Sequence, residues 1–342
     1  MNTRGRFWLS LGVVAGATTA AVAGYLRRSR QHRLALARCA CNLTQEAVAG
    51  LGVPAECRWI RAGDVELHAV IAGPDDGPLA LLLHGFPECW YSWRRQIPAL
   101  VGAGYRVVAV DQRGYNLSDK PLGVQHYQID RLTGDIAALI RALGRERAVL
   151  VAHDWGGVVA WRFAMDHPEA VDRLVVMNAP HPVAFAKALK SDRSQQRKSW
   201  YIFAFQLPWL PEALLALSPA ASARLFFRRT AVRRDAFSDA DLEVMAAALA
   251  QPGAARCMVD WYRAAFRFRA ASSARTIEAP TLLIWAEDDV ALGKSLASGL
   301  ERGVRHLQVH FISNCGHWVQ NEAPDEVNER MLAFLPGRTG PC

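Results

Sequence analysis

The sequence has 342 residues, 51% of them hydrophobic, and a formal net charge of +8. This length allows one large α/β domain, or such a domain with an insertion, and a sizeable buried core. Seven arginines and no acidic residue lie within residues 1–40, which leaves a net charge of +1 for the other 302 residues. The positive charge therefore belongs to an N-terminal flank, which excludes nucleic acid as a partner of the rest of the chain.

The segment from Phe7 to Leu26 is a run of twenty uncharged residues. As a helix it would span about 30 Å, the thickness of a bilayer core. We predict a single-pass membrane anchor. The arginines are denser after the segment than before it, so the catalytic domain is expected on the cytoplasmic side. A cleaved signal peptide is an alternative, because residues 21–23 resemble a cleavage site, and a soluble hydrophobic helix is another.

Short apolar runs recur along the rest of the chain after a predicted β-hairpin that turns at residues 62–64. Helical patterns separate most of these runs; the pattern over 129–144, for example, ends at Gly144. Near-continuous hydrophobic strands are typical of a parallel sheet covered by helices on both faces. We therefore predict an α/β fold with a doubly wound, mostly parallel sheet. The expected strands are 79–84, 105–110, 148–152, 173–178, 280–285 and 307–312.

The alternation of strands and helices breaks between residues 181 and 277. This stretch is rich in alanine, arginine and aromatic residues and lacks apolar runs of strand type. We interpret it as a helical cap inserted into a core formed by residues 55–180 and 278–337. A cap in this position lies over the carboxyl ends of the strands, where α/β sheets bind their ligands.

The stretch "AHDWGG" carries the first candidate catalytic residue, Asp154. It follows an apolar strand and precedes an apolar helix, with Ala152 before the aspartate and Gly156 and Gly157 after it. Small residues at these positions allow a sharp strand-to-helix turn that raises the central side chain above the sheet. Asp154 is thus a candidate nucleophile, although an aspartate in this position could also simply cap the helix.

Two later strands are followed by an acid, Asp289, and by a histidine, His317. The chain order nucleophile, acid, histidine is the order in which α/β hydrolases supply their catalytic triad. The histidine would take a proton from water, and the carboxylate would orient the imidazole. Asp288 and Glu287 are rival acids. The histidines at positions 84, 153 and 181 are assigned to turns instead.

The loop "HGFPECW" follows the first parallel strand, at residues 84–90. Main-chain N–H groups from such a loop and from the residue after the nucleophile form an oxyanion hole in this kind of site. We expect Phe86 and Trp155 to supply these N–H groups. Pro87 would fix the shape of the loop through a cis peptide bond.

The motifs "HGFPE", "DQRGYNLSDKP", "AHDWGG" and "GHW" together resemble those of the α/β-hydrolase-fold epoxide hydrolases, over about residues 55–337. Membrane-anchored members of this family are also similar in having an N-terminal hydrophobic segment. The "HDWGG" turn is shared with haloalkane and fluoroacetate dehalogenases. One departure from the family pattern is Asn116, which stands where glycine is usual; asparagine tolerates the left-handed backbone well.

The resemblance implies two cap tyrosines, Tyr201 in "SWYIFAFQ" and Tyr262 in "DWYRAAFRF". Neutral phenols would donate hydrogen bonds to the oxygen of an epoxide. We expect an enzyme that converts an apolar epoxide to a vicinal diol through an ester on Asp154, without a metal or cofactor. The alternatives are a haloalkane or haloacid dehalogenase of the same fold and a catalytically silent, membrane-tethered protein.

Overall fold

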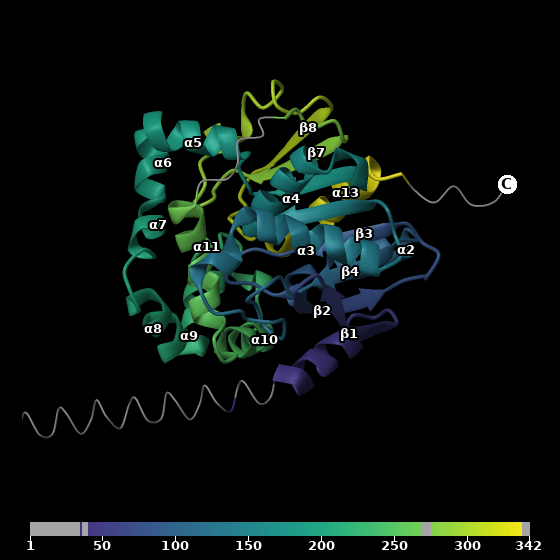
Figure 1. The fold of residues 1–342 in the computed structure, drawn as a ribbon, viewed down its shortest axis with the longest axis horizontal. Coiled ribbons are helices and arrows are strands. Elements are labelled where there is room, and N and C mark those ends of the chain that lie inside the picture. Colours follow the sequence, from purple (N-terminus) through teal and green to yellow (C-terminus); the bar gives the residue numbers. More distant parts are fainter. Residues whose placement is uncertain (1–34, 36–39, 269–274, 337–342) are drawn as a thin grey trace, which may run out of the picture.

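A single sheet of eight strands forms the centre of the molecule, in the spatial order β1-β2-β4-β3-β5-β6-β7-β8 (Figure 1). The computed structural model describes residue 35 and residues 40–268 and 275–336. The strands are β1 (Ala55–Ala62), β2 (Val65–Ala72), β3 (Leu79–Leu83), β4 (Arg106–Val110), β5 (Ala148–His153), β6 (Val171–Met177), β7 (Thr281–Ala286) and β8 (Leu307–Ile312).

The predicted parallel sheet is confirmed. Strands β3 to β8 pair in parallel, whereas β1 and β2 form an antiparallel hairpin whose second strand joins the sheet at β4. The hairpin turns at Gly63, whose φ of 65° lies in the left-handed region that suits glycine. The six predicted apolar runs coincide with β3 to β8 to within two residues at each end. Burial of both faces of the central strands explains why these runs contain few polar residues.

Helices cover both faces of the sheet, so that the core has two layers. Along β3, Leu81 and Leu83 pack in one layer, while Ala80 and Leu82 pack in the other, because successive side chains of a strand point to opposite faces. The first layer includes residues of α3 (Ile129–Ala142) and α4 (Asp154–Asp166), and the second includes residues of α2 (Gln96–Gly102) and α13 (Pro324–Phe334). A short helix, α12 (Val319–Glu322), precedes α13.

Between β6 and β7 the chain leaves the sheet and forms the cap. Figure 1 shows the cap helices gathered on one side of the sheet, with α6, α7 and α8 along the outer edge. The helices are α5 (Pro182–Ser191), α6 (Arg193–Lys198), α7 (Trp200–Ala204), α8 (Leu210–Leu217), α9 (Pro219–Ala223), α10 (Asp239–Ala250) and α11 (Ala254–Arg267). Arg94 of the core contacts Asp241 of α10, with 2.9 Å between Nε and Oδ1, and so ties the cap to the core.

The predicted membrane anchor, residues 7–26, lies outside the described residues. Among the residues that the structure describes, none of the helices combines the length and the apolar character needed to span a bilayer.

Candidate active site

Asp154 occupies the turn between β5 and α4, at the carboxyl edge of the sheet. Its φ of 48° is unusual for a residue with a side chain. Two glycines make the turn sterically feasible. A Cβ on Gly156 would lie 2.1 Å from the carbonyl oxygen of Leu83, and a Cβ on Gly157 would lie 2.3 Å from the Cβ of Ala179. Backbone strain of this kind is concentrated at functional sites, because the surrounding structure has to hold it in place.

The loop after β3 meets Asp154 from the other side. The N–H of Phe86 donates a hydrogen bond to Oδ1 of Asp154 at 2.8 Å. A Cβ on Gly85 would lie 2.4 Å from the Cβ of Asp154, so glycine permits this close approach. The Phe86–Pro87 peptide bond is cis, as predicted. Trp155 is the second residue of α4, where an N–H has no partner inside its own helix, so its role as a second donor stays a prediction.

His317 lies between Asp154 and Asp289. Its Nδ1 is 2.7 Å from Oδ2 of Asp289, and its Nε2 is 3.6 Å from Oδ2 of Asp154. Asp289 is 1% exposed, whereas its predicted rivals point elsewhere: Asp288 is exposed, and Glu287 forms an ion pair with Lys294. The structure thus brings together the aspartate, acid and histidine on which the sequence analysis settled.

Neighbouring charges shift the pKa values of Asp289 and His317. Burial alone would raise the pKa of Asp289, but the imidazole of His317 and the hydrogen bonds from His317 and Asn178 hold that pKa below its ordinary value. Burial alone would lower the pKa of His317, but the carboxylates of Asp289 and Asp154 raise it to about 9. Asp289 therefore stays ionised at neutral pH and stabilises a positive charge on the imidazole.

Tyr201 of α7 and Tyr262 of α11 make an edge contact with ring centroids 6.0 Å apart, and both line the cavities beside Asp154. The ring of Tyr262 also makes edge contacts with Phe86 and Trp155, at 5.2 and 4.9 Å between centroids. Burial, reinforced by the negative charge of Asp154, raises the pKa of both phenols far above the ordinary value. Both hydroxyl groups are therefore neutral hydrogen-bond donors throughout the working range of an enzyme.

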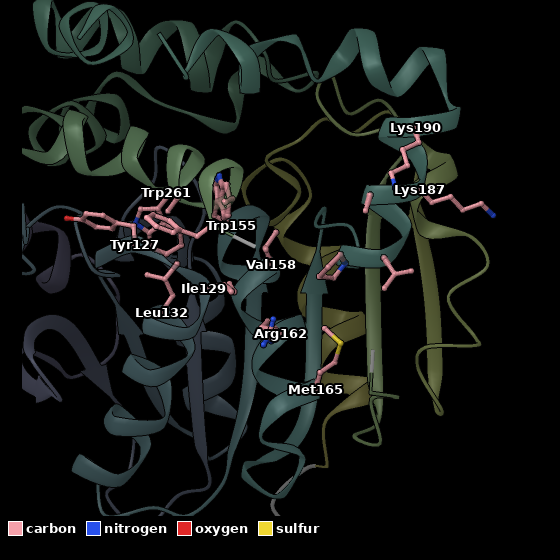
Figure 2. A pocket seen from close by; sticks show the side chains of 16 residues that line it. Tyr127, Ile129, Leu132, Trp155, Val158, Arg162, Met165, Lys187, Lys190 and Trp261 are labelled. Carbon is pink, nitrogen blue, oxygen red and sulfur yellow. The ribbon is translucent and has the colours of Figure 1, made fainter. Parts of the chain in front are cut away.

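Two cavities of about 290 and 280 Å³ meet at Asp154, Tyr201 and Tyr262. The first lies towards α5 and α11 and has an almost entirely apolar lining. The second contains His317 and Lys198. A larger cavity of about 720 Å³ lies along α4 and is bounded by α3, α5 and α11; Figure 2 shows side chains that line it. It adjoins the first cavity, because the two share lining residues, namely Trp155, Val158, Pro182, Ala186 and Ala265.

Sequence reasoning missed a second buried carboxylate–histidine pair beneath the site. The prediction that His153 lies in a turn is wrong: it is the last residue of β5 and is fully buried. Its Nδ1 is 2.7 Å from Oε2 of Glu88, and its Nε2 is 2.9 Å from the carbonyl oxygen of His317. The other histidines assigned to turns lie outside helices and strands: His84 follows β3, and His181 caps α5.

Asn178 was also missed. It follows β6 and donates to Oδ2 of Asp289 at 2.7 Å, while its Oδ1 accepts the N–H of Ala286 at 2.8 Å. It therefore links two strand ends beside the acid. Asn116, the departure from the family pattern, has a φ of 38° and donates to Oδ2 of Asp111 at 2.8 Å, so asparagine keeps the left-handed conformation as predicted.

The sheet order, the nucleophile turn and the inserted cap define an α/β hydrolase, and the model of the alpha/beta hydrolase fold family matches residues 78–324. Epoxide hydrolase 1 of Caenorhabditis elegans is 42% identical over 284 residues, covering 82% of this chain and 70% of the relative. Epoxide hydrolase 3 of Xenopus tropicalis is 40% identical over 287 residues, covering 81% and 77%. The crystal structure of Bacillus megaterium epoxide hydrolase with an inhibitor is similar with a TM-score of 0.76 and 31% identity, covering 81% of this chain and 99% of that one. The chain therefore belongs to the epoxide hydrolase family.

Proposed function

We propose that this protein hydrolyses an apolar epoxide to a vicinal diol through a covalent ester on Asp154. The observation that carries the proposal is the pairing of a carboxylate at the turn between β5 and α4 with two neutral phenols in the same cavity lining. A carboxylate suits this chemistry. Ring opening by a serine would leave an ether that water does not readily cleave, whereas a carboxylate leaves an ester that water can cleave.

In the first half-reaction, Oδ2 of Asp154 attacks a ring carbon of the epoxide. The C–O bond of the ring breaks, and its electron pair goes to the epoxide oxygen. Tyr201 and Tyr262 donate hydrogen bonds to that oxygen as negative charge develops on it. Oδ1 takes no part in the attack, because it accepts the N–H of Phe86 and becomes the carbonyl oxygen of the ester.

In the second half-reaction, His317 takes a proton from water, and the resulting hydroxide attacks the carbonyl carbon of the ester. Asp289 stabilises the imidazolium that forms. The N–H groups of Phe86 and Trp155 stabilise the oxyanion on Oδ1. The intermediate then collapses, and the imidazolium of His317 gives its proton to the departing oxygen. The proton left on the carboxyl group of Asp154 passes by way of the cap tyrosines to the former epoxide oxygen, so the diol leaves and the carboxylate of Asp154 is restored.

The cavity lining favours an apolar substrate. Phe185, Leu189, Ile202 and Phe266 contribute to the almost wholly apolar wall beside Asp154. The adjoining cavity along α4 provides further room for a hydrophobic substituent (Figure 2). Burial of such a substituent contributes about 25 cal/mol per Å² of apolar surface removed from water.

Single-turnover hydrolysis in ¹⁸O-labelled water tests the ester. With enzyme in excess over an aryl epoxide, the first diol should carry unlabelled oxygen from Asp154, and the label should enter the protein. Asp154→Ala should give no diol above the uncatalysed rate. Direct appearance of ¹⁸O in the first product would rule out the ester.

Dehalogenation is the alternative reaction, because the nucleophile turn and the triad could also displace a halide. A halide leaves as a stable anion and needs no phenol to assist it, so Tyr262→Phe should then have little effect. Release of chloride or fluoride from halogenated substrates, without diol from epoxides, would support this alternative. A catalytically silent protein would release neither product.

We also propose that residues 7–26 anchor the protein in a membrane as a single span, with the catalytic domain on the cytoplasmic side. The support is the uncharged run of twenty residues followed by clustered arginines. An anchored protein should stay with the membrane fraction after an alkaline carbonate wash, and a cleaved signal peptide should instead give a shortened chain in the wash.

A further inference from the structure

Helix α6 of the cap packs against the loop that carries the acid of the triad. This loop, residues 287–295, follows β7 and contains Asp289. Within α6, Gln195 is 1% exposed and Lys198 is half-buried, whereas Arg197 is exposed. The side of α6 that faces the core therefore presents two polar side chains to this loop rather than apolar ones.

Gln195 bridges two main-chain groups of the acid loop. Its Oε1 accepts the N–H of Gly293 at 2.8 Å, and its Nε2 donates to the carbonyl oxygen of Ala291 at 2.9 Å. Nε2 also donates to the hydroxyl oxygen of Ser199 at 2.9 Å. Rotating the amide by half a turn would place donor against donor and acceptor against acceptor, so the bridge has one orientation. Gln195 thus fixes both sides of residue 292.

Lys198 contacts the acid residue itself. Its Nζ donates to the main-chain carbonyl oxygen of Asp289, and its side chain lines the same cavity as Asp154 and His317. A third contact comes from the residue that caps α6: Oδ2 of Asp192 accepts the hydroxyl of Ser295 at 3.1 Å. The contacts from α6 and its cap therefore extend along the loop from residue 289 to residue 295.

Both carboxylate oxygens of Asp289 are held by hydrogen bonds within and beside this loop. Its Oδ1 accepts the N–H groups of Ala291 and Leu292 at 2.7 and 3.0 Å. Its Oδ2 lies 2.7 Å from His317 and from Asn178. Because the carboxylate is bound to its own main chain, a shift of the loop would move the carboxylate relative to the imidazole. The loop itself is at the surface, with Val290 52% exposed.

We propose that Gln195 and Lys198 are positioning residues, through which cap helix α6 holds Asp289 in line with His317. This inference rests on the proposed function, and it assigns these two residues to the second half-reaction. Hydrolysis of the ester depends on the orientation of His317 by Asp289, whereas attack by Asp154 on the epoxide does not. A displacement of about 1 Å at a catalytic group is enough to slow a reaction markedly.

The kinetic test separates the two half-reactions in single-turnover experiments, with the Asp154 ester followed by mass spectrometry of the intact full-length protein. In Lys198→Met, ester formation should stay within about twofold of the wild-type rate, while ester hydrolysis slows about tenfold and the ester accumulates. Lys198→Arg keeps a cationic donor and should restore most of the hydrolysis rate. Arg197→Met, on the exposed side of the same helix, is the matched control and should behave like the wild type.

Hydrogen–deuterium exchange provides a readout that needs no substrate. Peptides spanning residues 287–297 should exchange faster in Lys198→Met and in Gln195→Met than in the wild type or in Arg197→Met. Unchanged exchange in this loop would overturn the inference, as would an equal slowing of both half-reactions. A wild-type protein without diol production would instead overturn the proposed function, and the exchange experiment would still decide the positioning role.

Discussion

Two buried carboxylate–histidine pairs meet at a single carbonyl group in this protein, yet only one of them faces the cavity. In each pair a carboxylate oxygen lies 2.7 Å from Nδ1 of the histidine: Asp289 with His317, and Glu88 with His153. The pairs are connected because Nε2 of His153 is 2.9 Å from the main-chain oxygen of His317. They differ at the remaining nitrogen, since Nε2 of His317 faces Asp154 at 3.6 Å.

The difference shows that pairing with a carboxylate does not by itself make a histidine a base. His153 lies between a carboxylate and a carbonyl group, so both of its ring nitrogens are engaged and neither faces the cavity. Glu88 is saturated as well: it accepts the N–H of Gly85 at 3.0 Å, the side-chain N–H of Gln320 at 2.9 Å and the hydroxyl of Ser92. This pair holds the main chain of His317 in place, whereas in the proposed mechanism His317 performs the proton transfer.

The largest expected effect comes from removing the base. His317→Gln keeps Asp154 and the tyrosines, so the ester should form, but its hydrolysis should slow by about a thousandfold or more. The mass of the intact protein should increase by the mass of the substrate and stay increased. Continued release of diol at the wild-type rate would contradict the assignment of His317 as the base.

Changing the Glu88–His153 pair should lower the stability of the fold more than the rate of the reaction. His153→Gln leaves the carboxylate of Glu88 buried without its histidine partner, which should lower the free energy of unfolding by about 3 kcal/mol. Urea unfolding measures this loss. The folded fraction should still hydrolyse the ester faster than His317→Gln does.

A double variant distinguishes two explanations for the lower stability of His153→Gln, namely the unpaired charge on Glu88 and the loss of the contact itself. His153→Gln combined with Glu88→Gln removes the buried charge as well, so part of the stability should return. If the double variant has a lower free energy of unfolding than His153→Gln, an unpaired charge on Glu88 is not the cause of the stability lost in the single variant.

The cap tyrosines should show the opposite kinetic pattern from His317. Tyr262→Phe removes one donor to the departing oxygen, so ester formation should slow about tenfold while ester hydrolysis is unchanged. Tyr201→Phe should behave in the same way. Rapid-quench measurement of both steps checks this. A variant slowed only in ester hydrolysis would contradict the assignment of that tyrosine to ester formation.

The sequence predicts those residues of the site that lie in a recognisable local motif, and it misses those that are defined only by contacts between distant parts of the chain. Asp154 is recognisable because its turn needs small residues at fixed spacing, and His317 because it follows a strand end. The contact of Glu88 with His153 joins residues 65 apart, and that of Gln195 with Ala291 joins residues 96 apart. Neither spacing has a local signature, because each contact arises only once β3 lies beside β5 or the cap lies on the core.

The smallest expected effect is a shift in pH dependence, which tests how Asp154 acts on the base. The pKa of His317 is raised from 6.5 to about 9 in the folded protein, so its contribution to stability is fully present below pH 6.5 and is lost as the pH rises through about 9. Asp154→Asn removes one of the carboxylates that raise this pKa. The alkaline loss of stability still begins near the unfolded pKa of 6.5, but it should be smaller and should end at a lower pH than in the wild type, as thermal unfolding over about pH 6 to 10 would measure.

Formation of the ester removes the same negative charge. The pKa of His317 should therefore fall when Asp154 is alkylated, which favours the neutral imidazole that must take a proton from water. The single-turnover rate of ester hydrolysis should consequently reach its plateau below the pH at which the resting histidine titrates. The resting value is measurable by NMR titration of the His317 ring. Coincidence of the two titrations would mean that the charge of Asp154 does not affect the pKa of His317, and that the other carboxylates around the imidazole set it.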